Sequence, residues 1–140
     1  MRYISLTAAL VVCLWVAMAE QATAQASAVQ PVARMYSDAQ GETHIETVMM
    51  DVGRSNGFSG TETTYFSRFA ADMDLDWHPA PRRQYVITLS GEVEIGLEDG
   101  TMYRYGPGHV NLAEDVTGHG HTTRVVGDVP RVTATVQLAD

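Results

Sequence analysis

The sequence predicts an all-β fold, either a sandwich or a small barrel, and two observations predict it. Short runs with strand-like alternation recur between residues 63 and 138, and turn residues separate them. Helical periodicity is almost absent from the same stretch. Strands of this length bury their apolar faces by packing in two layers or by closing into a barrel. The 140 residues are enough for one such domain.

Residues 1–26 have the order of a secretory signal peptide. Arg2 supplies a positive charge, an apolar run follows, and small residues place the cleavage site near Ala24 or Ala26. The apolar run is shorter than the roughly 20 residues that cross a bilayer, which disfavours the alternative of a membrane anchor. We therefore expect a secreted or periplasmic protein whose single domain is residues 27–140, without membrane association after cleavage.

Composition narrows the chemistry of this domain. Cys13 is the only cysteine and lies in the leader, so the mature domain is expected to have no disulfide, thiolate ligand or cysteine nucleophile. The formal net charge is -8, and every basic side chain is an arginine. A negative charge of this size argues against nucleic acid as a partner. A small molecule is the expected partner.

The first part of the domain predicts strands joined by polar turns. Its strands have a β-branched bias, and three acids alternate with apolar residues at the end of this part, as on an exposed edge strand. The predicted elements are an extended segment at 28–35, a turn at Gly41, a strand at 44–52, a loop at 54–62, a strand at 63–70 and an edge strand at 71–76.

The second part has the strongest strand signals. Residues 84–90 are apolar on both faces, which indicates a strand in the interior of a sheet. Residues 92–98 alternate cleanly, with Val93, Ile95 and Leu97 expected to face inward. The remaining predicted elements are a hairpin turn at Asp99-Gly100, a return strand at 101–105, a tight turn at Gly106-Pro107-Gly108, a strand at 109–115, a flexible loop at 116–121, and two strands up to 138 separated at Gly127-Asp128.

Residues 64–138 carry two motifs that resemble those of cupins. His78 and Gly91 have the spacing of the first cupin motif, with Ala80 at the place of its second histidine and Gln84 at the place of its glutamate. The Gly-Pro-Gly corner, followed by His119 or His121, resembles the second motif. APRRQ, LSGEVE, GPG and AED are also similar to a subgroup of small single-domain bacterial cupins, in which the position of His121 is the typical one.

The resemblance implies a cupin-type double-stranded β-helix, also called a jelly-roll barrel, with a pocket in its mouth. It also implies that His78, Gln84 and His121 are the metal ligands, for a divalent Fe, Mn, Ni, Zn or Cu ion. His44 or Glu114 would complete the ligand set if the fold brings either one in. The alternative is a hydrogen-bonded polar cluster without metal.

Two further features bear on the pocket. By parity with Gln84, Arg82 is expected to face the pocket and hold an anion, with Arg83 on the opposite face. The alternative for these arginines is a salt bridge to Glu114 or Asp115, and Arg124 has the same two interpretations. His119 lies between two glycines and has two interpretations, either a residue that closes over a ligand or a surface residue. His109 is expected to be exposed.

The sequence therefore predicts an exported cupin-like protein with a small-molecule pocket. One hypothesis is an enzyme acting on a small organic acid, of the isomerase, lyase or oxygenase type. In it His121 and Arg82 are catalytic, with a metal as Lewis acid or with His121 as general acid and base. The other hypothesis is a non-catalytic binding barrel without metal. Because cupins are commonly dimers, the resemblance also implies a homodimer.

Overall fold

A computed structural model describes residues 29–51 and 61–139, which form ten β-strands and contain no helix. The predicted leader and most of the predicted 54–62 loop lie outside these residues. Within the described ranges, no helix is long and apolar enough to cross a membrane. The strands are β1 (Val29–Ser37), β2 (Thr43–Asp51), β3 (Thr61–Phe69), β4 (Asp74–His78), β5 (Gln84–Ser90), β6 (Glu92–Gly96), β7 (Met102–Tyr105), β8 (Val110–Glu114), β9 (His121–Val126) and β10 (Arg131–Leu138).

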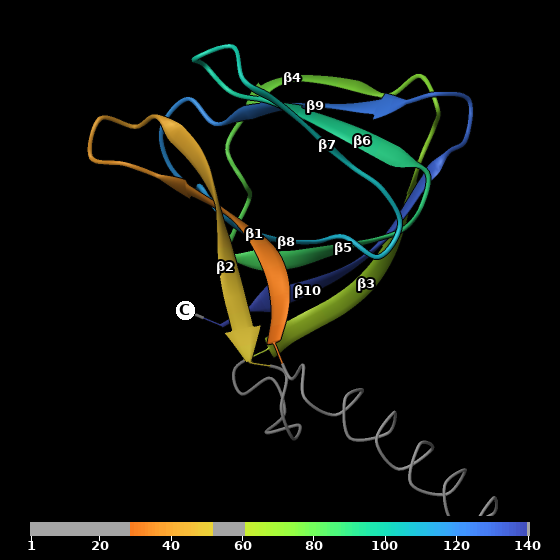
Figure 1. The fold of residues 1–140 in the computed structure, drawn as a ribbon, viewed down its shortest axis with the longest axis horizontal. Helices are drawn as coiled ribbons and strands as arrows, with labels where there is room; N and C mark the ends of the chain where they lie inside the picture. The colour runs from red at the N-terminus through yellow and green to blue at the C-terminus, as the bar shows by residue number, and fades with distance from the viewer. Residues whose placement is uncertain (1–28, 52–60, 140) are drawn as a thin grey trace, which may run out of the picture.

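The strands form two sheets that face each other across the interior of the molecule (Figure 1). The larger sheet has the order β2-β1-β8-β5-β10-β3, and the smaller has the order β4-β9-β6-β7. Along the chain, strands β3 to β10 cross from one sheet to the other at every step except from β6 to β7, which are neighbours in the smaller sheet. This is the arrangement of a jelly roll, in which two Greek keys wrap around one interior. The predicted fold class, an all-β jelly-roll barrel, is confirmed.

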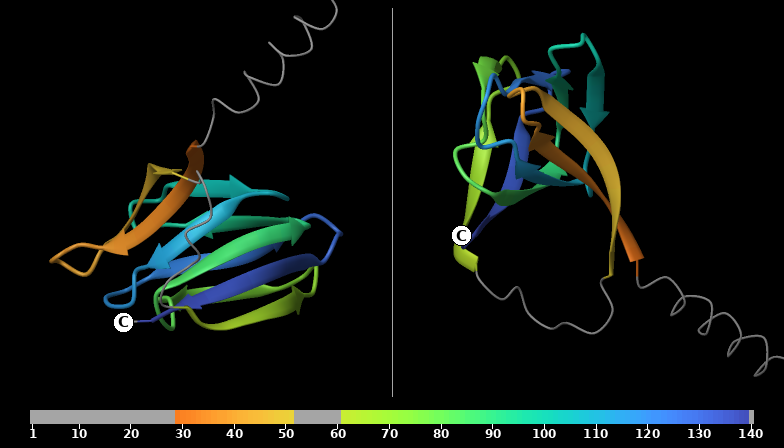
Figure 2. Two further views of the ribbon diagram at one scale, coloured as in Figure 1. Left: turned by 90° about the horizontal axis from the view of Figure 1, so that it is seen from below. Right: turned by 90° about the vertical axis from the view of Figure 1, so that its left-hand side faces the viewer.

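The first two strands form a long hairpin added to this barrel (Figure 2). Strand β1 runs parallel to β8, with Ala33 opposite Asn111 and Met35 opposite Ala113. The segment predicted as a merely extended entry is therefore a full member of the larger sheet. It places the buried side chain of Met35 in the wall of the barrel interior.

The apolar core lies between the two sheets. Val93 and Ile95 of β6 are buried, as is Leu97 just after it, so the predicted inward face of this strand is confirmed. They pack in one cluster with Met35 and Ala113 from the larger sheet. Burying these side chains between two sheets supplies the hydrophobic stabilisation that joins the layers.

Two strands of the larger sheet, β5 and β10, instead turn polar side chains toward the interior. Thr133 and Thr135 of β10 are buried, whereas the alternate residues of this strand are only partly buried. On β5 the inward Thr88 is 1% exposed and the next residue, Leu89, is 47% exposed. A buried polar face requires hydrogen-bond partners, so this part of the barrel interior is suited to a polar ligand and not to an apolar core.

The 116–120 loop is held against two neighbouring segments, contrary to its predicted flexibility. The His119 amide donates a hydrogen bond to the Gly41 carbonyl, 3.1 Å away. A Cβ atom at Gly118 would overlap the Gly41 carbonyl, and one at Gly120 would overlap the His78 carbonyl. These glycines therefore permit close backbone approach and do not serve as hinges.

Candidate functional site

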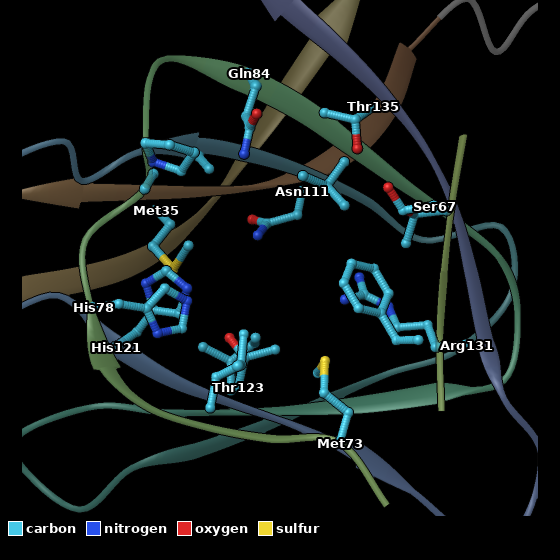
Figure 3. A pocket seen from close by; sticks show the side chains of 18 of the residues that line it. Met35, Ser67, Met73, His78, Gln84, Asn111, His121, Thr123, Arg131 and Thr135 are labelled. Atoms are coloured by element: carbon cyan, nitrogen blue, oxygen red, sulfur yellow. The ribbon is translucent and has the colours of Figure 1, made fainter. Parts of the chain in front are cut away.

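A pocket lies inside the barrel between the two sheets, with a cavity volume of about 150 Å³. Its apolar lining comes partly from Met35 and Ile95, and its polar lining comes from both sheets. Figure 3 shows His78 and His121 on one side of the pocket and Arg131 on the other, with Asn111 between them. The pocket therefore has two chemically different ends joined by a polar wall.

His78 and His121 form one end of the pocket. They are register partners on the antiparallel strands β4 and β9, and their ring centroids are 4.6 Å apart. The Nδ1 of His78 lies 2.6 Å from the backbone carbonyl oxygen of Asp76, which can only accept a hydrogen bond. Nδ1 therefore carries the hydrogen, and Nε2 is the acceptor nitrogen of this ring.

Asp115 orients His121 in the same way. Its Oδ2 lies 2.6 Å from the His121 Nδ1, and its side chain is fully buried. The Thr43 hydroxyl lies 3.4 Å from the same oxygen, and the Asp115 backbone carbonyl accepts a hydrogen bond from the Ala80 amide. A carboxylate facing Nδ1 leaves Nε2 of His121 as the acceptor nitrogen. The sequence predicts Asp115 only as a salt-bridge partner of an arginine, and nothing local in the sequence points to its role beside His121.

Gln84 reaches the pocket as expected from its position in the motif. It is the first residue of β5, is buried, and lines the cavity. Its Oε1 atom is buried without a hydrogen-bond partner among the described residues. Ala80, which stands at the place of a cupin histidine, is buried in the apolar cluster and also lines the pocket.

The expectation that Arg82 faces the pocket is wrong. Its guanidinium is 2.7 Å from the Glu62 carboxylate, and its side chain is 47% exposed. The parity argument failed because β5 begins only at Gln84, after a bend in which proline precedes the arginines, so strand alternation does not extend back to Arg82. Arg83 faces outward and pairs with Glu114, as one of the alternatives held.

The arginine that does line the pocket is Arg131, at the start of β10. It is only 7% exposed, and its guanidinium donates to the Thr88 hydroxyl at 3.0 Å from Nη2. No carboxylate of the described residues lies within ion-pair distance of it. Burial lowers the pKa of Arg131 to about 10, so the side chain still carries its charge at neutral pH.

The alternation of residues around Arg131 is visible in the sequence, but it indicates the wrong face of the strand as the buried one. Arg131, Thr133 and Thr135 alternate with Val132, Ala134 and Val136, and the usual assignment puts the apolar set inside. In the structure the polar set faces the interior and is more deeply buried. Only the position of β10 between β5 and β3 shows which face is turned to the pocket.

The other candidate residues lie outside the pocket. His119 stacks on Trp77, with ring centroids 4.5 Å apart, so His121 is the pocket histidine. Arg124 forms an ion pair with Glu94. His109 is half-buried rather than exposed as expected, because its ring stacks on Tyr105 at 3.7 Å.

His44 and Glu114 do not complete the ligand set of His78 and His121. Glu114 is held by Arg34 and Arg83. His44 pairs with Asp38 in the β1–β2 turn, where Glu42 lies close enough for the three to hold a metal ion in principle. The Asp38 carboxylate also accepts the Glu42 amide hydrogen, so these contacts serve to close the turn.

The donor set of the pocket fits a transition metal only in part. His78 and His121 each present Nε2 while Nδ1 is held by an acceptor, which is the usual state of metal-binding histidines. Gln84 adds a neutral amide, and no third histidine or carboxylate of the described residues joins the pair. Without a carboxylate ligand, the set lacks the negative charge that helps to hold a divalent ion.

No protein-family model matches the chain, and no curated protein matches it. Among solved structures, the chain is similar to the cupin domain of Cnp3 from Schizosaccharomyces pombe, at 11% identity over 84% of this chain and 88% of that chain, with a TM-score of 0.47. It is also similar to a protein of known crystal structure from Neisseria meningitidis, at 11% identity over 79% and 84% of the two chains, with a TM-score of 0.39.

Proposed function

We propose that the barrel binds a small organic acid, with the ligand carboxylate paired to Arg131. The observation that carries this proposal is the buried guanidinium in the pocket wall, which has a threonine hydroxyl but no carboxylate as partner among the described residues. A buried cation without a counter-ion is costly, because burial removes its hydration. Arginine also matches a carboxylate with two parallel hydrogen bonds.

The opposite end of the pocket would then hold the rest of the ligand at His121. With Nδ1 bound to Asp115, Nε2 can accept a proton from a ligand, as the base of a His–Asp pair does. This arrangement supports the enzymatic form of the proposal, an isomerase or lyase in which His121 moves a proton. The alternative is a binding barrel in which His121 only accepts a hydrogen bond from the ligand. In both forms we propose that the protein is exported, on the basis of residues 1–26.

Substitutions of two arginines, Arg131 inside the pocket and Arg82 outside it, test the binding proposal. We expect titration calorimetry with acetate, propionate, lactate and pyruvate to detect binding of at least one acid. The Arg131→Met variant should bind that acid about 10-fold to 100-fold more weakly, because a charge-assisted hydrogen bond contributes about 1.5 to 3 kcal/mol. The matched control is Arg82→Met, which removes an exposed arginine paired with Glu62 and should leave binding unchanged.

Two results would contradict the proposal. The first is that none of the acids binds to the wild-type protein. The second is that Arg131→Met binds as well as wild type, which would place the anion elsewhere. Equal loss in Arg82→Met would restore the sequence-based expectation for Arg82.

A metal centre at His78 and His121 is the second candidate function. The observation that favours it is that both rings hold Nδ1 in a hydrogen bond and leave Nε2 as the donor atom for a ligand. A bound ion would act as a Lewis acid toward an oxygen of the organic acid. We expect metal analysis after exposure to Fe, Mn, Ni, Zn and Cu to find less metal in a His78→Ala/His121→Ala variant than in wild type. Equal metal contents would remove this candidate.

A further inference from the structure

The pocket wall between the histidines and Arg131 contains buried polar atoms that no part of the described chain satisfies. These atoms are the amide oxygens of Gln84 and Asn111 and the hydroxyls of Thr123 and Thr133. Three of them come from the neighbouring strands β8, β5 and β10 of the larger sheet and one from β9 of the smaller sheet, so they lie on both sides of the cavity. Buried polar atoms nearly always have a partner, so a molecule in the pocket is the natural partner here.

The size of the cavity limits that molecule. A volume of about 150 Å³ is close to that of a cavity that holds one benzene molecule, so the enclosed part of a ligand has about six non-hydrogen atoms. A carboxylate with a chain of two or three further carbons fits this limit. A long-chain acid would have to leave most of its atoms outside, and an aromatic acid would leave part of its atoms outside.

The chemistry of the unsatisfied atoms selects among small acids. An amide oxygen only accepts hydrogen bonds, so Gln84 Oε1 and Asn111 Oδ1 each require a donor on the ligand. An ionised carboxylic acid offers no donor, and neither does a keto group. A hydroxyl group donates one hydrogen bond and also accepts, so each hydroxyl can serve one amide oxygen and a threonine hydroxyl together. Lactate has one such group and glycerate has two, one for each amide oxygen.

We infer that the ligand is a short hydroxy acid of three or four carbons. This inference rests on the proposed function, because it assigns the carboxylate to Arg131. The hydroxyl lies at the polar wall formed by Gln84 and Asn111. An acid without a hydroxyl leaves these atoms unsatisfied inside the pocket, which is the condition under which protein sites reject a ligand that lacks one polar group.

The test compares acids that differ in one group at a similar size. Calorimetric titrations use lactate and glycerate as hydroxy acids, propionate as the acid without an oxygen substituent, and pyruvate as the keto acid. We expect lactate or glycerate to bind at least about 10-fold more tightly than propionate and pyruvate. In the Asn111→Leu variant, which keeps the side-chain size but cannot form hydrogen bonds, this preference should fall to less than about 3-fold while propionate still binds.

Matched variants separate the pocket amides from other amides of the sheet. Gln84→Met should also reduce the preference. Gln137→Met should not, because Gln137 is the register partner of Gln84 on β10 but does not line the pocket. Circular dichroism of each variant checks that the fold is retained, and preserved propionate binding shows that the pocket remains intact.

The outcomes distinguish this inference from the proposed function. If propionate, pyruvate and the hydroxy acids bind equally and Arg131→Met abolishes all of them, the hydroxy-acid inference is wrong and the organic-acid function stands. Ordered water at the polar atoms would give that result. If no acid binds at all, both proposals are overturned. A preference for lactate that survives in Asn111→Leu and in Gln84→Met contradicts the assignment of the hydroxyl to this wall.

Discussion

At the scale of single residues, the site depends on side chains that are buried with few partners. Among the described residues, Arg131 has the Thr88 hydroxyl as its side-chain hydrogen-bond partner, and one carboxylate oxygen of Asp115 has no hydrogen-bond partner. Residues arranged for stability are normally paired, as Arg83 and Arg34 are with Glu114. Buried polar groups without a full set of hydrogen-bond partners lower the stability of the fold, and such groups are common at sites where a protein binds a ligand.

This contrast predicts the effect of Arg131→Met on the protein without ligand. The substitution removes a buried charge but leaves the Thr88 hydroxyl without its donor, and the two effects oppose each other. We expect the free energy of unfolding to change by no more than about 1 kcal/mol in urea titrations. A loss of about 3 kcal/mol or more would show that Arg131 is a paired structural residue.

At the scale of structural elements, the predicted strands are close to the observed ones. Residues 84–90 lie between β8 and β10 in the middle of a sheet, as a run that is apolar on both faces indicates. The predicted edge strand corresponds to β4, which is at the edge of the smaller sheet. The loop at 116–120 differs, because glycine permits both flexibility and close packing, and the sequence does not distinguish them.

The close packing of this loop predicts an unequal response to two glycine substitutions. Gly118 and Gly100 both have positive φ, 79° and 85°, so alanine at either position is strained by about 1 kcal/mol. At Gly118 the new Cβ would also overlap the Gly41 carbonyl, whereas nothing lies within 4 Å at Gly100. We expect Gly118→Ala to lower the free energy of unfolding by about 3 kcal/mol and Gly100→Ala by about 1 kcal/mol.

Chemical denaturation of the two variants checks this difference. Similar losses for the two variants would mean that the loop adjusts freely to the added methyl group. In that case the 116–120 segment would be flexible, as its glycines first indicated, and a lid role for His119 would again be reasonable.

At the scale of the whole molecule, the two sheets enclose one interior that is apolar in one part and polar in another. Both sheets contribute to the apolar core and to the polar pocket wall, and Arg131 and the buried threonines of β10 belong to the larger sheet. His109, just before β8, stacks on Tyr105 of β7. Burial lowers the pKa of His109, and the charge of Arg131 lowers it further.

The lowered pKa of His109 predicts how stability depends on pH. The unfolded chain binds a proton at this histidine near pH 6.5, whereas the folded protein does so only at lower pH. Stability therefore decreases as the pH falls below 6.5 toward the folded pKa, because protons favour the unfolded state in that window. We expect His109→Phe, which keeps an aromatic ring beside Tyr105, to show a smaller decrease between pH 7 and pH 5 in urea titrations carried out at about five pH values.

The carboxylates serve as an internal reference for this measurement. Burial raises the pKa of Glu114, but the hydrogen bonds from Arg34 and Arg83 outweigh it and leave the pKa below its usual value of 4.5. Its contribution to stability is present above that value and is lost as the pH falls below it. Below pH 4.5, wild type and His109→Phe should lose this contribution alike. Equal pH dependence of stability in the two proteins between pH 7 and pH 5 would contradict the role assigned to His109.

The sequence by itself determined the fold class, the positions of most strands along the chain and three of the residues expected at the pocket, because alternation, turn residues and motif spacing are local signals. It placed His78, Gln84 and His121 at one pocket, where the structure also has them. Only the tertiary structure decided that Arg131 lines the pocket, that Arg82 does not, and that Asp115 holds His121. The physical reason is that these facts depend on which face of a strand meets the other sheet, and residues far apart in the chain decide that.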